Sequence, residues 1–143
     1  MGTMFKVTKR IEWDSAHRLV KGYDGLCANN HGHHYAAEIT VQSEVFNQYD
    51  FVIDFKMFKE IKKWIDEKWD HATLLNDEDD NFRTFLEDNK QRLNLFVTGK
   101  NPTAENMAKR LHDVACHIFA DCEVKVVCVK VFETPTSWAE YSE

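Results

Sequence analysis

The sequence lacks the features that mark several large classes of protein. Its 24 acidic residues outnumber its 18 basic ones, which gives a formal net charge of −6 and no basic surplus for binding nucleic acid. No apolar run approaches the roughly 20 residues needed to span a bilayer. Residues 1–6 contain no apolar signal core. We therefore expect a cytoplasmic protein that binds neither nucleic acid nor membrane.

Two metal or redox motifs are also missing. None of the four cysteines forms a C-x-x-C pair, which excludes a zinc knuckle and a thioredoxin-like motif. No H-E-x-x-H pattern occurs, which disfavours a generic zinc hydrolase. In the cytoplasm we expect the cysteines to be reduced thiols.

Enough apolar material is present for one folded domain. The 143 residues are 43% hydrophobic, and no linker or low-complexity tract divides them, so residues 1–143 are expected to form a single domain. The apolar spacing predicts strand, strand, helix, helix, strand, strand, at residues 5–17, 33–45, 54–68, 101–119, 123–134 and 137–141. Two hairpins flanking a helical pair indicate an α+β fold, an antiparallel sheet with both helices on one face.

Both predicted helices start at recognisable capping residues. Asp54 is the expected N-cap of the first helix, and Asn101 followed by Pro102 is expected to start the second. Residues 77–92, between the helices, are acidic and less regular, with apolar spacing that hints at a short helix. His112 lies off the main apolar stripe of the second helix, so we expect it to be solvated.

Three histidines are candidate metal ligands. His31 and His33 stand two residues apart at the start of the second strand, where alternate side chains share a face. His17 ends the first strand and would lie beside them if the two strands form a hairpin. Three histidines plus an open position are the pattern of a catalytic zinc site, and loop histidines with ordinary hydrogen bonds are the alternative. His34 has the opposite strand parity and is expected to be a non-ligand.

Cys27 lies in a polar loop four residues before His31. A metal or a protonated histidine nearby would lower the pKa of this thiol from about 8.5, so that the thiolate could remove a proton from a substrate. A fourth zinc ligand and a passive loop cysteine are the alternatives. The three-residue spacer does not decide between them.

The Asp70–His71 pair follows the first predicted helix. An aspartate can orient an imidazole and stabilise its protonated form, which makes the pair a candidate proton donor or acceptor near neutral pH. A capping role at the end of the helix is the more common explanation of such a dipeptide.

Three further residues are candidates for binding a ligand. Strand parity places Glu133 on an apolar face, where a carboxylate is costly unless it is paired. It could accept two parallel hydrogen bonds from a guanidine-like group, or lie at the strand end in solvent. Thr103 and Glu105 stand in the first turn of the second helix, where capping and the helix dipole explain them without any ligand.

Taken in chain order, these motifs carry a family resemblance that covers nearly the whole sequence. They are Ser15-Ala16-His17-Arg18-Leu19, Cys27-x3-His31-Gly32-His33, Val52-Ile53-Asp54-Phe55, Asp70-His71, Leu75-Asn76, Asn101-Pro102-Thr103-Ala104-Glu105-Asn106 and Glu133-Thr134. Each motif is weak alone, but the ordered set is highly specific. The sequence resembles the 6-pyruvoyl-tetrahydropterin synthase / 6-carboxytetrahydropterin synthase family.

The resemblance implies a tunnelling fold (T-fold), a four-stranded antiparallel sheet with two helices on one face in the order ββααββ. It implies that subunits join their sheets into a barrel, commonly a trimer stacked into a hexamer, with active sites at subunit interfaces. By the same resemblance, His17, His31 and His33 match the zinc ligands and Cys27 matches the catalytic base.

The resemblance also assigns the remaining candidates. Asp70 and His71 match a catalytic pair that is expected to come from the neighbouring subunit. Glu133 matches the carboxylate that anchors the pterin, and Thr103 and Glu105 match the segment that lines the pterin pocket.

The three-residue gap between Cys27 and His31 resembles the bacterial queuosine-pathway members of the family. It implies a zinc-dependent 6-carboxy-5,6,7,8-tetrahydropterin synthase, a lyase that converts 7,8-dihydroneopterin triphosphate to 6-carboxytetrahydropterin, acetaldehyde and triphosphate. One alternative is a 6-pyruvoyl-tetrahydropterin synthase, which eliminates triphosphate without breaking a carbon–carbon bond. Another is a module that binds zinc and pterin without catalysis.

Overall fold

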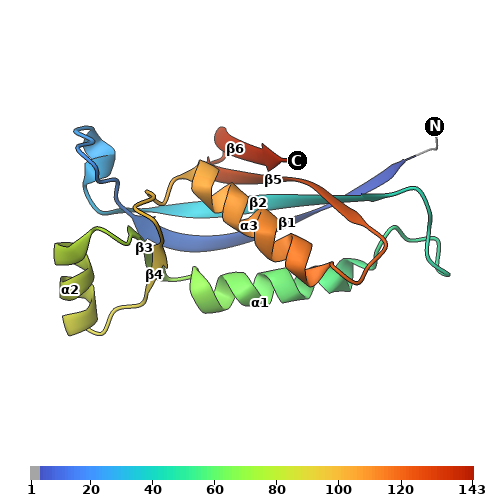
Figure 1. The fold of residues 1–143 in the computed structure, drawn as a ribbon, viewed down its shortest axis with the longest axis horizontal. Coiled ribbons are helices and arrows are strands. Elements are labelled where there is room, and N and C mark those ends of the chain that lie inside the picture. The colour runs from blue at the N-terminus through green and yellow to red at the C-terminus, as the bar shows by residue number, and fades with distance from the viewer. Residues whose placement is uncertain (1–3) are drawn as a thin grey trace.

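The computed structural model describes residues 4–143, and its two longest strands and two longest helices run side by side along the molecule (Figure 1). In chain order the elements are β1 (Phe5–His17), η1 (Leu26–Ala28), β2 (His31–Ser43), η2 (Phe55–Phe58), α1 (Lys59–Lys68), β3 (Ala72–Asn76), α2 (Asp80–Asp88), β4 (Leu93–Phe96), α3 (Ala104–Ile118), β5 (Lys125–Thr134) and β6 (Ser137–Ser142). No helix among the described residues is long and apolar enough to cross a membrane.

The β1–β2 hairpin is the longest element pair of the fold. Its strands are antiparallel over their whole length and end with His17 opposite His31. Alternate side chains of β1, such as Ile11 and Trp13, are buried, as the period-2 pattern predicts. β2 begins two residues earlier than predicted, because its pairing with β1 continues as far as His31.

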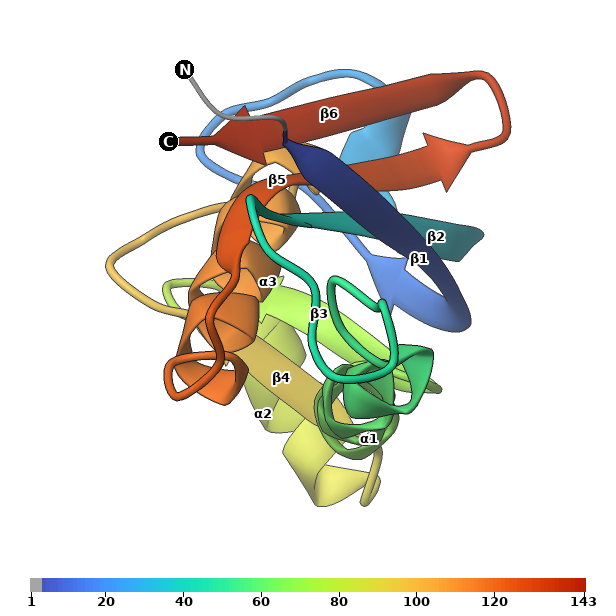
Figure 2. The ribbon, with the colours of Figure 1, turned by 90° about the vertical axis from the view of Figure 1, so that its right-hand side faces the viewer.

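Within residues 4–143 the sheet has six strands in the order β4-β3-β1-β2-β5-β6 (Figure 2). The four predicted strands do pair antiparallel, but the predicted number is wrong. β3 and β4 add to the other side of β1, and the β1–β3 and β3–β4 pairs are parallel. These two strands have five and four residues, and β3 is mostly buried on both faces, so neither carries an alternating pattern.

Both long helices pack on one face of the sheet, as predicted (Figure 2). α1 buries Ile61 and Ile65, and α3 buries Met107 and Leu111. All four lie in one hydrophobic core with strand residues such as Val129. Burying an aliphatic side chain of this size contributes roughly 1.5–3 kcal/mol, so the apolar stripes of the two helices hold them against the sheet.

The helix starts agree only in part with the prediction. Asp54 does accept a backbone hydrogen bond at 2.9 Å, but it caps the short turn η2 that precedes α1. The second helix begins later than Asn101–Pro102 predicts, because Thr103 is the N-cap of α3 and accepts from the Asn106 backbone N–H at 3.2 Å. Since Pro102 lies outside the helix, its carbonyl can accept a hydrogen bond from elsewhere in the fold.

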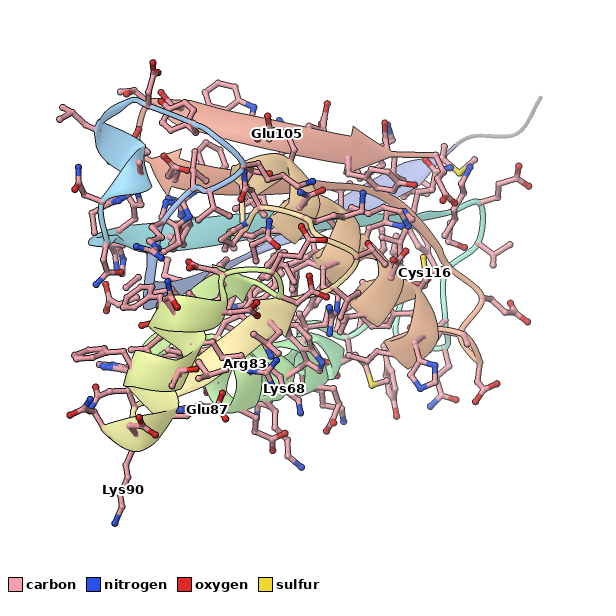
Figure 3. The ribbon with its side chains drawn as sticks, turned by 60° about the vertical axis from the view of Figure 1, so that its left-hand side comes forward. Lys68, Arg83, Glu87, Lys90, Glu105 and Cys116 are labelled. Carbon is pink, nitrogen blue, oxygen red and sulfur yellow. The ribbon has the colours of Figure 1, made fainter. Side chains whose placement is uncertain are left out.

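The acidic segment 77–92 contains helix α2, as its apolar spacing hinted. α2 lies at the same end of the molecule as the loop between β1 and β2 (Figure 1). It buries Leu86 and exposes an ion pair in which Arg83 Nε lies 2.8 Å from Glu87 Oε1 (Figure 3). The segment therefore packs on the rest of the fold through Leu86 and through polar contacts, among them the ion pair of Asp79 with Arg18.

His112 is buried, so the prediction that it is solvated is wrong. Only 2% of the residue is exposed, and its ring packs against Tyr141, with the ring centroids 4.9 Å apart. β6 covers this side of α3, and the sequence pattern of α3 alone contains no sign of that contact.

Candidate active site

The β1–β2 hairpin brings the three candidate ligands together. His17 and His31 are directly paired, and His33 is two residues further on the same face of β2. Their ring centroids are 4.6 to 5.2 Å apart, and one ring nitrogen from each lies within 4.8 Å of the others. Neighbouring nitrogens in a tetrahedral zinc site are about 3.4 Å apart, given Zn–N bonds of about 2.05 Å. The cluster therefore has the dimensions of a three-histidine metal site.

Backbone carbonyls fix the orientation of two of these rings. The Nδ1–H of His17 donates to Pro102 O at 2.7 Å, and the Nδ1–H of His31 donates to Asn29 O at 2.7 Å. Each neutral ring then has its lone pair on Nε2. The two Nε2 atoms lie 3.1 Å apart, where bare lone pairs repel each other. A shared cation removes that repulsion, and such carbonyl contacts are typical of histidines that bind metal.

His33 supplies an independent argument for a metal. Its Nε2 is buried and has no hydrogen-bond partner among the described residues, and Glu133 Oε1 is 3.5 Å away. Burial lowers the pKa of both His33 and His17, which favours the neutral imidazole that binds metal. The donor set thus fits Zn²⁺, which binds histidine nitrogen readily.

Tyr35 lies against the histidine cluster, and the sequence pattern did not single it out as a neighbour of the site. Its hydroxyl is 3.3 Å from His17 Nδ1, and burial raises its pKa far above the ordinary value, helped by the negative charge of Glu133. The phenol therefore stays protonated. The signal was present in the strand parity, because Tyr35 follows His33 at two-residue spacing.

Glu105 and Glu133 come together at a small pocket. They line a cavity of about 250 Å³ with Trp138 and three small residues. Glu105 lies in the first turn of α3, on the side next to β6 (Figure 3), and Glu133 lies at the end of β5. Thr103 is half-buried and its side chain caps α3, so its hydroxyl already has a structural partner. Glu133 thus faces both this pocket and His33.

Cys27 lies in η1, within the loop that joins β1 to β2. It is half-buried and not in a disulfide, and its carbonyl accepts a hydrogen bond from Leu19 N at 2.8 Å. Cys27 is not in the group formed by His17, His31 and His33, whose ligand nitrogens all lie within 4.8 Å of one another. The loop therefore holds the thiol outside that close group of ligand atoms.

Although His71 and His33 line the same surface cavity of about 500 Å³, Asp70 and His71 are not in the close group of three histidines. They form a second group with Asp14, in which Asp70 Oδ1 accepts from Asp14 N at 3.0 Å. His71 Nε2 is 3.8 Å from Asp70 Oδ2, and 75% of the His71 side chain is exposed. His71 therefore faces solvent, where a second molecule could reach it, while the Asp70 side chain is only 26% exposed.

His34 points away from the histidine cluster, as its parity predicts. Its two ring nitrogens lie 2.8 Å from Asp14 Oδ1 and 3.0 Å from Glu12 Oε1. These two carboxylates raise the pKa of His34. His34 is exposed and contacts Asp14, which belongs to the same group as Asp70 and His71.

The sequence matches the family model described as 6-pyruvoyl tetrahydropterin synthase over residues 6–143. The chain belongs to the 6-pyruvoyl tetrahydropterin synthase family. It is thus an enzyme of the pterin synthase type. Its curated relatives include the 6-carboxy-5,6,7,8-tetrahydropterin synthase of Rickettsia felis, which is 35% identical over 96% of this chain and 99% of the relative. The Haemophilus influenzae protein of the same name is 34% identical over 98% and 100%.

Solved structures confirm the tunnelling fold of this pterin synthase family member. An uncharacterized protein from Wolinella succinogenes superimposes with a TM-score of 0.86 at 20% identity, covering 99% of both chains. The 6-pyruvoyl tetrahydropterin synthase of Plasmodium vivax gives a TM-score of 0.74 at 17% identity, covering 99% of this chain and 98% of that one. These likenesses concern the fold, and the predicted roles of the individual site residues stay predictions.

Proposed function

We propose that the protein is a zinc-dependent 6-carboxy-5,6,7,8-tetrahydropterin synthase. The substrate would be 7,8-dihydroneopterin triphosphate, and the products 6-carboxytetrahydropterin, acetaldehyde and triphosphate, as in the formation of queuosine. The observation that carries the proposal is the cluster of three inward-facing imidazoles beside Glu133. The names of the full-length relatives support the carboxy product over the pyruvoyl product.

His17, His31 and His33 would hold the zinc ion. The bound ion would act as a Lewis acid toward oxygen atoms of the substrate side chain. The protein contributes the geometry, because the Pro102 and Asn29 carbonyls aim two Nε2 atoms at one point. Three protein ligands leave a coordination position open for substrate, as catalytic zinc sites require.

Two groups would move protons. Cys27 is the proposed base, a thiolate that removes a proton from the substrate side chain. His71, oriented by Asp70, is the proposed partner for the complementary transfer. Because the pair lies outside the histidine cluster of its own subunit, we propose that it serves the site of a neighbouring subunit.

The acidic pocket would hold the pterin. A pterin presents a guanidine-like edge of parallel N–H donors, and a carboxylate can accept two such bonds. Glu133 is the proposed anchor because it faces the pocket and lies 3.5 Å from His33. Glu105 shares that pocket, and Thr103 stands beside it as the cap of α3. This placement would set the substrate side chain next to the imidazoles.

A ring of subunits would close the sheet. Residues 5–14 of β1 are unpaired on their outer side within the described chain, since β3 pairs only with residues 15–17, and β6 is the opposite edge strand. Long open edges invite pairing with another chain. Lys9 on one edge strand and Glu140 on the other carry opposite charges. We therefore propose a homo-oligomer, a trimer or a hexamer, with β1 of one subunit against β6 of the next.

Product analysis tests the proposed function. Zinc-loaded protein is incubated with 7,8-dihydroneopterin triphosphate, and the pterins are identified by mass spectrometry, with chelator-treated protein as the control. We expect 6-carboxytetrahydropterin from the zinc-loaded protein alone. A 6-pyruvoyl product would select the pyruvoyl alternative, and unchanged substrate would select the non-catalytic module.

A further inference from the structure

The acidic segment, extended here to residues 76–101 (the 76–101 segment), holds the chain just after His17 at two places. At the first place, the Arg18 guanidinium forms a two-bond ion pair with the carboxylate of Asp79. Asp79 is buried, and the guanidinium also stacks over the ring of Phe82, 4.6 Å from its centroid. Paired guanidinium–carboxylate bonds fix direction as well as distance. Arg18 is therefore held to α2 and its N-cap.

At the second place, the side chain of Asn101 pairs with both backbone groups of Val20. Its Oδ1 accepts from Val20 N at 3.1 Å, and its Nδ2 donates to Val20 O at 3.2 Å. Asn76, which is fully buried, donates from Nδ2 to Asn101 Oδ1 at 3.2 Å and to Gly99 O at 3.0 Å. Breaking one of these hydrogen bonds would leave a buried polar group without a partner, which costs free energy, so Asn76 and Asn101 are held in this one arrangement.

The same residues control the carbonyl that contacts His17. Pro102 follows Asn101, and its carbonyl accepts the His17 Nδ1–H at 2.7 Å. Asn106, in the first turn of α3, donates to the Asn101 carbonyl at 2.8 Å. Asn101, which precedes Pro102, is thus held both through its side chain and through its backbone carbonyl. Its freedom to move away from His17 is small.

We infer that Asn101 is a positioning residue for the metal site, acting through the Pro102 carbonyl on the His17 ring. The 76–101 segment then holds the end of β1 that carries His17 in a fixed position. This inference rests on the proposed metal site, since it assigns Asn101 a purpose only if His17 binds a metal. Partners of this kind hold the ligand ring in one tautomer and one orientation, and removing one typically costs 10- to 100-fold in metal affinity.

Zinc affinity of variants tests the inference. Asn101→Ala removes the side chain that holds Val20 but keeps the Pro102 carbonyl, so we expect about 10-fold weaker zinc binding, the lower end of the range for a direct partner, in competition with a chromophoric chelator. Asn89→Ala is the matched control, because the side chain of Asn89, the C-cap of α2, donates only to Phe85 O among the described residues and contacts nothing near His17. Its zinc affinity should equal that of the wild type. Co²⁺-loaded protein gives a second readout, a changed visible absorption spectrum in Asn101→Ala alone.

Asn106→Ala keeps the test decisive if Asn101→Ala does not fold. It removes one hydrogen bond to the Asn101 carbonyl, for which we expect about 2- to 10-fold weaker zinc binding. Wild-type affinity in the foldable variants, with only a lower melting temperature, would overturn the inference and leave the proposed function intact. If the wild-type protein itself binds no zinc, the proposed function fails first.

Discussion

The Nε2 atoms of His17 and His31 lie 3.1 Å apart across the β1–β2 hairpin, while the Nδ1 atom of each ring faces a backbone carbonyl. Direct pairing in the strand register produces this approach. Two neutral rings held in this way point their Nε2 lone pairs at each other. The lone pairs repel each other, and a cation bound between them removes that repulsion. The geometry of the hairpin thus favours a bound cation between His17 and His31, and His33 adds a third ligand nitrogen to the same group.

Removing one ring of the cluster should remove the metal. His31→Ala leaves two protein ligands, and we expect the bound zinc, measured by elemental mass spectrometry after dialysis, to fall from about one ion per chain to near zero. His34→Ala is the control, because His34 is exposed on the opposite face. Equal zinc content in the His31 variant and the wild type would refute the three-histidine site.

Replacing the thiol should separate catalysis from metal binding. In Cys27→Ala we expect turnover to fall by at least about 100-fold, the usual contribution of a general base, while the zinc content stays unchanged. Cys116→Ala, which alters an exposed cysteine on α3, should behave as the wild type. Loss of zinc in Cys27→Ala would instead make the thiol a fourth ligand.

Glu133 should act mainly through the pterin. Glu133→Gln removes the charge that would accept two hydrogen bonds, and charged hydrogen bonds contribute about 1.5–3 kcal/mol. We expect kcat/KM to fall roughly 10- to 100-fold, with zinc still bound. The exposed residue Glu44 gives the control variant Glu44→Gln, with unchanged kinetics expected. If Glu133→Gln has the kinetics of the wild type, Glu133 does not anchor the pterin.

Thr103 has a structural role that can be measured apart from any contact with substrate. Thr103→Ala removes the N-cap bond to Asn106 N, so we expect the free energy of unfolding in urea to fall by about 1 kcal/mol. Thr103→Ser keeps the hydroxyl and should restore the stability. If KM rises in the alanine variant and recovers in the serine variant, the hydroxyl also serves the pocket.

Mixed oligomers can show whether the active site is shared. Cys27→Ala and His71→Ala should each be inactive alone. After the two are unfolded and refolded together, random assembly would give about a quarter of the sites an intact pair from different subunits. We expect activity to return to about that fraction. Continued inactivity in an oligomer of proven mixed composition would place both residues in one subunit's site.

Much of the fold was predictable because the long elements repeat their pattern many times. The buried alternation in β1 continues from Ile11 to His17, and the stripes of α1 and α3 run along helices of ten and 15 residues, so packing cannot easily override them. β3 and β4 are too short to show a period, and their parallel pairing with β1 depends on contacts distant in sequence. The burial of His112 also depends on such a contact, with β6.

The candidate site was predictable as far as local spacing reaches. His31 and His33 share a face by parity, and hairpin pairing adds His17. Sequence spacing does not show that Pro102 O meets His17, because 85 residues separate the two. The same holds for the pairing of Asn101 with Val20. Backbone carbonyls carry no sequence signature, so the residues that hold the ligands became visible only in the fold.

The ratio of acetaldehyde to triphosphate tests the central claim most directly. Acetaldehyde is followed by its reduction with alcohol dehydrogenase, and triphosphate by chromatography, in one reaction of zinc-loaded protein with 7,8-dihydroneopterin triphosphate. A 6-carboxytetrahydropterin synthase releases both in equal amounts, and that is the result we predict. Triphosphate without acetaldehyde would contradict the account, because it would mean elimination with the carbon–carbon bond intact.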